Sequence, residues 1–381
     1  MIVLSNLKIK TIYNLLDLYL LSVALLTLDV LLSASVPLRV IYLPLHPLTM
    51  IIIYIIICLQ LYAGRYNRTK TVIGCILIFL GILNYVQFHR NWLLYLAFIL
   101  LFIEGRDIKK VIKVIYKCLI VVISINFIGF FICYLAFPDM VNVKYSKDII
   151  RYDMFCGDHP NTAVRLWIFV VISWFSLYYE MLSWKKWIIL LSLTSYVYYF
   201  TRSEALLLIL VIFIFWLFRK SKIIICTLRF FARYGVGLML IFSLASLWMK
   251  SNPYLYKLYE FINLASTGRL FYTETALRVN NISIFGKEYV PGMQTAYGNV
   301  IYYVDNAYIF ILLYYGAIYF IILAIMIYLA VPKMNYIGLI CLTIYLLYGL
   351  IENGIFDVVS VVPLIFVVDA LYKHKINGFS H

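Results

Sequence analysis

The sequence predicts an all-α polytopic membrane protein with about twelve transmembrane helices. Of its 381 residues, 65% are hydrophobic and only 13% are charged, whereas a soluble domain is about half apolar and about one quarter charged. The mean hydropathy is +0.96. Because one crossing takes about 20 apolar residues, twelve crossings use roughly 240 residues, which matches the hydrophobic content. We therefore expect a single integral membrane domain over residues 1–381.

Apolar runs separated by short charged breaks place the spans. They are predicted at about 11–32, 41–62, 71–88, 91–103, 114–137, 162–182, 187–200, 205–218, 234–249, 306–330, 336–351 and 355–372. The first run lacks a small-residue cleavage site, which favours a spanning helix over a signal peptide. The shortest runs are expected to extend into polar neighbours, or to be tilted or re-entrant.

The distribution of Lys and Arg predicts the orientation. With a cytoplasmic N-terminus, 20 of the 32 basic residues fall in cytoplasmic segments, five of them in a predicted turn at 219–233. The positive-inside rule therefore puts both termini in the cytoplasm. The two long loops, 138–161 and 250–305, then lie outside, where we expect the function. The net charge of +15 is thus explained mainly by topology, and no nucleic-acid partner is expected.

Several kinds of site are not predicted. The seven cysteines form no CxxC motif and the five histidines are scattered, so neither a disulfide framework nor a metal site is expected. The sequence contains no GxxxxGK[ST], no GxGxxG and no Asp-x-Asp. Nucleotide binding through a glycine-rich loop is therefore not predicted, and neither is any cofactor.

The loop 250–305 is predicted to hold two helices. Residues 254–264 carry an apolar stripe at helical spacing and are expected to lie in the membrane interface. A second helix should end near Val279, with Ser266 or Thr267 as its N-cap.

The charged residues of this loop are the first site candidates. Glu274 lies four residues before Arg278, which favours a structural ion pair. Arg269 has no carboxylate at that spacing and is freer to bind a ligand. Asp305 directly precedes the helix 306–330, so it either caps that helix or accepts a proton from a substrate hydroxyl. Glu352 lies in a later outer turn.

The shorter loop leads into further candidates. Asn161 is a plausible N-cap, and His159 is either solvated or functional. Arg165 lies one turn inside a span, where a charge is costly and tends to face a cavity or a partner. The outer face thus carries a set of arginines, at positions 151, 165, 202, 269 and 278. The planar guanidinium group of arginine suits phosphate. An anionic phosphate ligand is expected. Some of the 35 tyrosines can stack on sugar rings, although interface anchoring explains most of them.

The order of these motifs resembles a known family. The matching motifs are His159-Pro160-Asn161, Arg202-Ser203, Ser266-Thr267-Gly268-Arg269, Ile284-Phe285-Gly286-Lys287-Glu288, Asp305-Asn306-Ala307-Tyr308, Gly316, Glu352 and Phe356. This layout is similar to the O-antigen and capsular polysaccharide polymerases of the Wzy type, within the O-antigen ligase/polymerase superfamily. The similarity of layout covers nearly the whole chain, and each motif is short.

The resemblance implies a metal-independent GT-C-type glycosyltransferase in the bacterial cytoplasmic (inner) membrane. Its donor would be a glycan on undecaprenyl pyrophosphate, and its acceptor another lipid-linked repeat unit. The resemblance also implies a flippase and a chain-length regulator of the same pathway, and membrane lipid, as partners. Ligase-like members tend to have His before the Asn of the last motif, so Asp305 favours a polymerase. An O-antigen ligase and a flippase or transporter of lipid-linked oligosaccharide are the alternatives.

The resemblance also implies roles for individual residues. Asp305 or Glu352 would activate the acceptor hydroxyl, and Arg202 and Arg269 would bind pyrophosphate, assisted by Arg165. The other expected substrate-binding residues are Arg151, His159, Asn161, Arg278, Asn306 and Tyr308.

Overall fold

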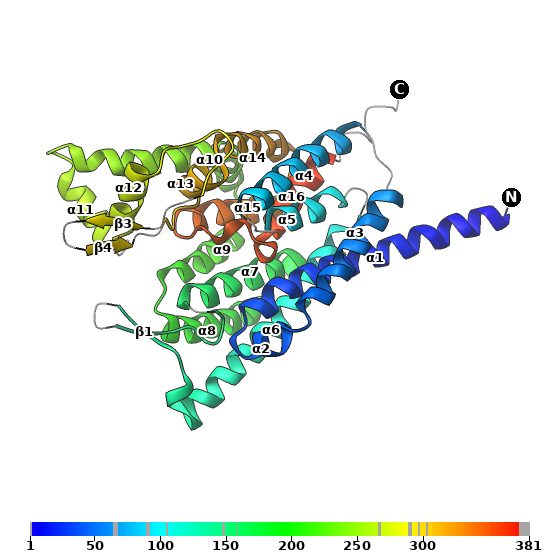
Figure 1. Ribbon diagram of the computed structural model, residues 1–381, viewed down its shortest axis with the longest axis horizontal. Coiled ribbons are helices and arrows are strands. Elements are labelled where there is room, and N and C mark those ends of the chain that lie inside the picture. The colour runs from blue at the N-terminus through cyan, green and yellow to red at the C-terminus, as the bar shows by residue number, and fades with distance from the viewer. Residues whose placement is uncertain are drawn as a thin grey trace. The chain divides into compact units, whose positions relative to one another are not determined.

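The computed structural model describes residues 2–63, 68–88, 92–103, 106–146, 149–157, 159–265, 268–288, 292–295, 298–301 and 304–372. Within these residues lie 16 α-helices and two short β-hairpins (Figure 1). Every predicted span contains a helix, which confirms the all-α class of membrane protein. The two hairpins were not predicted.

Helix length and composition support fewer crossings than predicted. Three helical segments are long and apolar enough to cross a membrane, namely Ile108–Ala136, Pro160–Met181 and Lys222–Ser251. The pair Val36–Tyr42 and His46–Tyr62, bent by 78°, would add a fourth. Six shorter apolar helices of 10–17 residues also occur in the described part of the chain. The twelve crossings therefore stay a prediction.

The chain divides into two compact units. Unit 1 comprises Met1–Cys75, Tyr95–Leu217 and Val358–Ile365, and unit 2 comprises Ile76–Leu94, Phe218–Asp357 and Phe366–His381. Three of the boundaries fall inside helices, namely α4 (Arg68–Phe88), α5 (Trp92–Leu101) and α16 (Val362–Tyr372).

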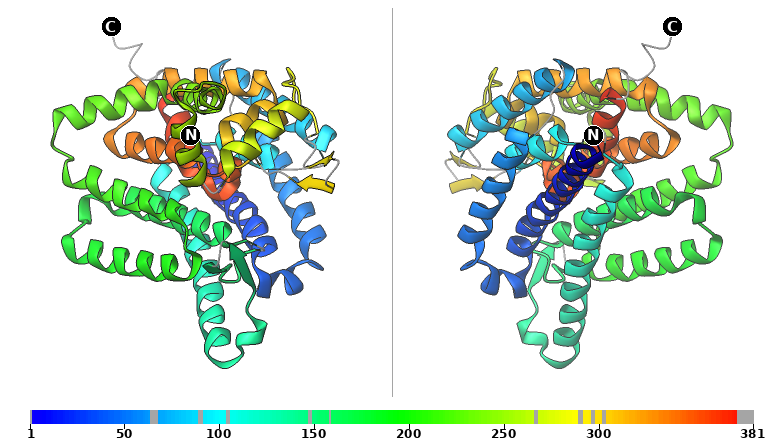
Figure 2. Two further views of the ribbon diagram at one scale, coloured as in Figure 1. Left: turned by 90° about the vertical axis from the view of Figure 1, so that its left-hand side faces the viewer. Right: turned by 90° about the vertical axis from the view of Figure 1, so that its right-hand side faces the viewer.

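Unit 1 is built on helices of very different length. They are α1 (Ile2–Ala34), α2 (Val36–Tyr42), α3 (His46–Ala63), most of α5 (Trp92–Leu101), α6 (Ile108–Ala136), α7 (Pro160–Tyr178), α8 (Trp184–Thr201) and α9 (Leu207–Leu217). Helix α6 lies along both α1 and α7 (Figures 1 and 2). The predicted loop 138–161 contains the hairpin of β1 (Val143–Ser146) and β2 (Ile149–Tyr152).

Aromatic rings hold this hairpin against the helices. The ring of Phe200, at the end of α8, lies 5.0 Å from that of Phe130 on α6 and 5.8 Å from that of Tyr152 on β2. Edge-to-face contacts of this kind each contribute about 0.5–1.5 kcal/mol beyond burial. The packing fixes β2 beside the C-terminal end of α8, which positions Arg151.

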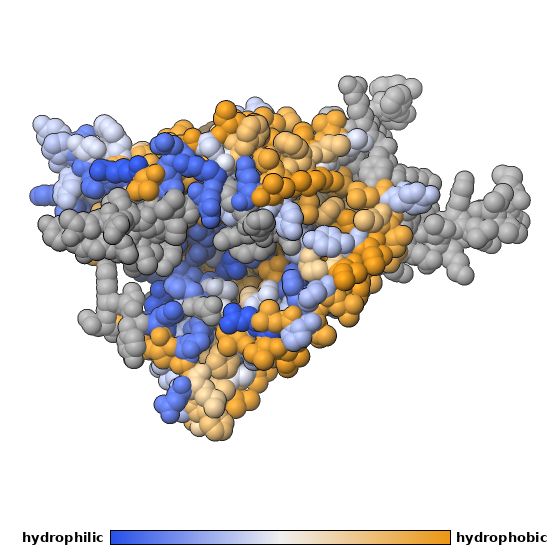
Figure 3. Space-filling view, in the orientation of Figure 1, coloured by the Kyte–Doolittle hydropathy of each residue, from blue (hydrophilic) through white to orange (hydrophobic). Residues whose placement is uncertain are grey.

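Unit 2 is organised around α10 (Lys222–Trp248), which packs against α14 (Ala317–Ala330) and α15 (Tyr336–Tyr348). The predicted loop 250–305 forms α11 (Tyr256–Ala265), α12 (Arg269–Val279) and the hairpin of β3 (Gly292–Thr295) and β4 (Gly298–Ile301). Both predicted loop helices are thus confirmed. In this unit hydrophilic residues gather over α11 and α12 and hydrophobic residues over α14 (Figure 3).

The basic segment 219–233 is not a turn along its whole length. Ser221 caps α10 by accepting a hydrogen bond from the Ile224 amide, and the helix starts at Lys222. Arg229 and Arg233 therefore lie on the helix itself. The helix was predicted to start at the apolar run, at residue 234, which is too late. A capped helix also includes polar residues, so its start is not marked by hydropathy.

The predicted helix 306–330 is broken. It consists of α13 (Ala307–Phe310), a π-helical turn at Ile311–Tyr315 and α14, with Gly316 between them at φ +94°. The amides of Ala317 and Ile318 donate to the carbonyls of Ser283 and Ile284. A Cβ on Gly316 would overlap the backbone of Gly286. A loop segment thus occupies the break and bonds the first amides of α14.

The last predicted span is also shorter than expected. Residues 355–372 begin with two 3₁₀ turns, Gly354–Phe356 and Val358–Ser360, and only Val362–Tyr372 is α-helical.

Candidate functional site

The first group of candidate residues lies in unit 2 around Arg269, the first residue of α12. Its Nε lies 3.0 Å from Asp305 Oδ2, and its Nη1 donates to the Ile351 carbonyl at 2.6 Å. The exposed fractions of the Arg269 and Asp305 side chains are 24% and 27%. Arg269 has no carboxylate at helical spacing, as predicted, but it is less free than expected, because a carboxylate 36 residues away in the sequence is adjacent in the fold.

Asn306, not Asp305, caps the helix that follows. Its Oδ1 accepts from the amides of Tyr308 and Ile309, and its Nδ2 donates to Ser243 Oγ on α10 at 2.7 Å. The capping interpretation of Asp305 is thus wrong. Its carboxylate instead pairs with Arg269, because the neighbouring amide side chain already satisfies the helix terminus.

The end of α15 anchors this segment. The carbonyls of Leu346, Gly349 and Ile351 accept from the Tyr308 hydroxyl, the Ala307 amide and Arg269 Nη1, respectively. The last carbonyls of a helix have no partner within it, which leaves those of Leu346 and Gly349 available as acceptors, and Ile351 lies in the turn that follows α15.

A further contact ties the Glu352 turn to the same segment. Asn353 Nδ2 donates to the Val304 carbonyl at 2.6 Å, and the Glu352 amide donates to the Tyr348 carbonyl. We call Arg269, Asp305, Asn306, Tyr308 and Glu352 the Arg269 cluster. The structure thus brings five predicted site residues together in unit 2.

Electrostatics distinguish Asp305 within this cluster. Burial raises the pKa of its carboxyl, and the positive charge of Arg269 opposes that rise without cancelling it. A carboxylate with a raised pKa binds a proton more readily than an ordinary aspartate. The pair thus combines a cation with a carboxylate of increased basicity.

Arg278 lies apart from this cluster, on the last turn of α12. Its guanidinium donates to Glu274 Oε1, and Lys250 Nζ lies 2.6 Å from Glu274 Oε2. The predicted helix ion pair is confirmed. Ser266 and Thr267 lie outside the described residues, and Gly268, with φ +86°, stands at the N-cap of α12.

The second group of candidates lies in unit 1, around Arg151 on β2. Its Nη2 donates to Asn161 Oδ1 at 2.7 Å, and its Nε donates to the Thr201 carbonyl at 2.8 Å. One guanidinium therefore joins the start of α7 to the end of α8. We call Arg151, His159, Asn161, Arg165 and Arg202 the Arg151 cluster.

His159 is the N-cap of α7, with Nδ1 accepting from the Asn161 amide at 3.2 Å. The prediction that Asn161 caps this helix is wrong, since its side chain is bonded to Arg151. Arg165 lies four residues after Asn161, on the same face of α7.

Arg202 is the exposed C-cap of α8, with φ +50°. Its guanidinium stacks over the Tyr199 ring, 4.9 Å from the centroid. A left-handed conformation costs a non-glycine residue about 1–2 kcal/mol, and strain of this kind concentrates at functional sites. The conformation turns Arg202 away from the direction of the helix.

The structure also contains a cluster of polar side chains that was not predicted from the sequence. His46 Nδ1 lies 2.7 Å from Asp29 Oδ1, and the Tyr42 hydroxyl donates to the same oxygen. Asp29 is buried and these contacts close the bend between α2 and α3. The signal was an aspartate inside the predicted span 11–32, where a charge requires a partner.

The chemistry available is therefore that of an arginine–carboxylate pair in unit 2 and of guanidinium and amide groups in unit 1. Guanidinium groups suit phosphate oxygens, and a carboxylate can accept a hydroxyl proton. Comparisons of the chain with protein-family models, with curated proteins and with solved structures give no match.

Proposed function

We propose that this chain is a polysaccharide polymerase that joins repeat units carried on undecaprenyl pyrophosphate. It is a GT-C-type glycosyltransferase of the bacterial cytoplasmic membrane, with about twelve crossings, both termini in the cytoplasm and its site at the outer face. The flippase and chain-length regulator of the same pathway are its expected partners. The motif layout and the apolar helices support this proposal.

The ion pair between Arg269 and Asp305 carries the proposal. In the reaction, the acceptor hydroxyl oxygen attacks the anomeric carbon of the donor, and the bond from that carbon to the pyrophosphate oxygen breaks. The hydroxyl proton passes to the Asp305 carboxylate, and lipid pyrophosphate leaves with the bonding electrons. The raised pKa of Asp305 suits this role, because a general base works best when its pKa approaches the working pH.

Arg269 serves two purposes in this scheme. Its contacts with Asp305 and Ile351 use two of the five N–H groups of a guanidinium, and they hold both side chains in one geometry. The other N–H groups are donors to the pyrophosphate oxygens. Pyrophosphate is already a good leaving group, so positioning and charge stabilisation matter more than a strong acid.

In unit 1, the Arg151 cluster offers phosphate-binding groups of its own. Arg202 presents an exposed guanidinium supported by Tyr199, and Arg165 assists it. Arg151 acts mainly by joining α7 to α8, so that the two helix ends keep a fixed spacing.

The test uses the purified full chain and a synthetic repeat unit on undecaprenyl pyrophosphate. Chain growth is followed on a gel, and released lipid pyrophosphate by mass spectrometry. Asp305→Asn is expected to slow elongation by about 10²–10⁴-fold, the usual contribution of a general base. The matched control Glu260→Gln, which neutralises an exposed carboxylate on α11 of the same unit, should elongate normally. Wild-type ladders from Asp305→Asn would contradict the proposed base.

One observation favours the transport alternative. Helices broken near a glycine are common at the substrate sites of transporters, and α13 and α14 are separated in that way. The two functions differ in cells. Loss of a flippase removes single repeat units from the cell surface, whereas loss of a polymerase leaves single units and removes longer chains. A ligase would transfer preformed chains to a different acceptor without lengthening them.

A further inference from the structure

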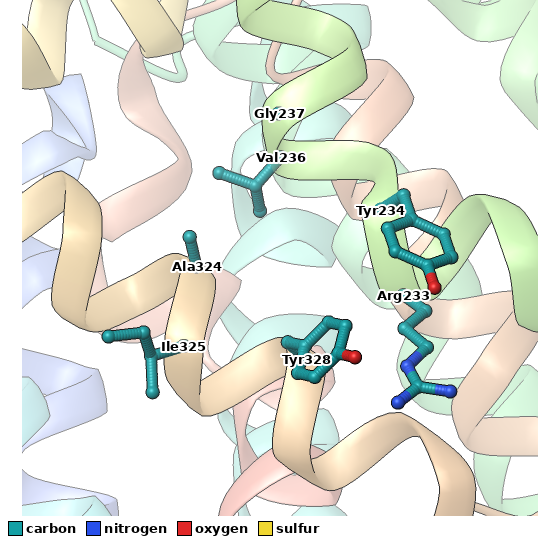
Figure 4. Close-up of a pocket in the computed structure, with 7 residues that line it drawn as sticks. All are labelled: Arg233, Tyr234, Val236, Gly237, Ala324, Ile325 and Tyr328. Carbon is teal, nitrogen blue, oxygen red and sulfur yellow. The ribbon is translucent and has the colours of Figure 1, made fainter.

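A groove on unit 2 lies away from the Arg269 cluster, between α10 and α14. It is lined by Arg233, Tyr234, Val236, Gly237, Ala324, Ile325 and Tyr328 and has a volume of about 290 Å³ (Figure 4). Ser243, which contacts Asn306, lies ten residues beyond Arg233 on α10. That separation corresponds to about 15 Å along the helix, so the groove is a separate feature.

Arg233 is the polar group of this groove. Its guanidinium lies over the Tyr328 ring, 4.2 Å from the centroid, with Tyr234 beside it (Figure 4). Among the described residues, its buried Nε has no hydrogen-bond partner. Arginine stays charged in proteins, and a buried donor without an acceptor is costly. An oxygen acceptor on a bound molecule would satisfy it.

The surrounding charge selects an anion. Lys222, Arg229 and Arg233 follow one another at spacings of seven and four residues, which puts them on one face of α10. Residues 205–259 and 317–351 contain no aspartate or glutamate, so neither helix supplies a neutralising carboxylate. Lys333 adds an exposed cation in the turn after α14, which packs against α10.

The rest of the groove is apolar and open. An added Cβ on Gly237 would meet no atom within 4 Å, and Ile241 and Ile325 beside it expose large hydrophobic surfaces. The occupant therefore needs an anionic head and an apolar tail. Basic pockets between membrane helices are known to hold anionic lipid head groups.

We propose that this groove binds an anionic phospholipid. Its phosphate accepts hydrogen bonds from Arg233, and one acyl chain lies along Gly237 and Ala324. Lys222, Arg229 and Lys333 add longer-range attraction for the head group. This site is independent of the proposed polymerase reaction.

The experiment measures lipid binding to the full chain by native mass spectrometry after purification in a nonionic detergent. The probes are phosphatidylglycerol, phosphatidylcholine and inorganic phosphate. The wild type should bind phosphatidylglycerol about tenfold more tightly than phosphatidylcholine, a preference that corresponds to one charge-assisted hydrogen bond. Arg233→Gln should abolish that preference, and Gly237→Phe should weaken phosphatidylglycerol binding by filling the groove while keeping the charge.

Lys185→Gln is the matched control, because it removes one exposed cation from α8, and it should bind as the wild type does. Thermal midpoints without added lipid should be alike for Gly237→Phe and the wild type, since the new ring enters open space. Unchanged lipid binding by Gly237→Phe would overturn the proposal. Equal binding of both phospholipids, or saturation of the site by inorganic phosphate at the same concentration, would also overturn it.

Discussion

The Arg269–Asp305 ion pair makes a quantitative prediction through a double-mutant cycle of Arg269→Ala and Asp305→Ala. Two unit charges about 4 Å apart attract by about 4 kcal/mol at an effective dielectric constant of about 20. Both side chains are about three quarters buried, so the cost of desolvation offsets part of this attraction. We expect a coupling free energy of about 1.5–2 kcal/mol.

The single substitutions should differ from each other. Arg269→Ala removes the partner of Asp305 and also the donor to the Ile351 carbonyl, so we expect it to lower the free energy of unfolding by about 2–3 kcal/mol. Asp305→Ala removes only the carboxylate and should cost about 1 kcal/mol less than Arg269→Ala. Arg278→Ala is the control on the same helix. Its side chain is 74% exposed, and exposed helix pairs contribute about 0.3–0.5 kcal/mol.

The assay is equilibrium unfolding of the purified chain in mixed micelles, with tryptophan fluorescence as the signal. Single and double variants are measured at the same protein and detergent concentrations. Effects of Arg269→Ala and Asp305→Ala that add to within about 0.5 kcal/mol would refute the coupling. The same result would remove the basis for assigning the two residues to one site.

Three further predictions concern the pH dependence of elongation, two glycines and Arg202. Elongation should fall with decreasing pH, because Asp305 must be ionised to accept a proton. Since its pKa is raised, the fall in rate should occur at a higher pH than for an ordinary aspartate. Arg269→Gln should move the fall to a still higher pH, and rate–pH profiles of both forms test this. Gly316→Ala should lower stability by about 2 kcal/mol or more, whereas Gly237→Ala should be neutral or stabilising by up to about 1 kcal/mol, a contrast that thermal unfolding will reveal. Arg202→Gly should keep or raise the free energy of unfolding because it relieves the left-handed strain, whereas Arg202→Val should lower it by about 1–2 kcal/mol. Both variants should lose elongation. Equal free energies of unfolding for the two variants would contradict the strain.

Helix positions were predictable because each apolar run must satisfy its backbone within the membrane by forming a helix. Helix ends were less predictable. Ser221 starts α10 well before its apolar run, since a cap depends on one hydroxyl and not on hydropathy. The break at Gly316 depends on a loop segment some 30 residues earlier, and a single glycine in an apolar run does not reveal that contact.

The site residues show a similar limit. Asp305 and Asn306 are both good capping residues, and only the position of Arg269 decides which of them caps the helix. His159 takes the capping role expected of Asn161, because Arg151, on a hairpin that was not predicted, binds the Asn161 side chain. Residue types and spacing indicated the candidate residues, but their partners depend on tertiary contacts.

The break at Gly316 has a consequence for how the protein is made. Residues 307–330 contain no charged or amide side chain and leave the ribosome after Ser283 and Ile284, whose carbonyls bond the first amides of α14. Until that loop segment docks, the amides of Ala317 and Ile318 can be satisfied in lipid only by continuing the helix from Tyr315. If this run crosses the bilayer as proposed, insertion is expected to begin with one straight helix, and the kinked form to follow when the loop docks.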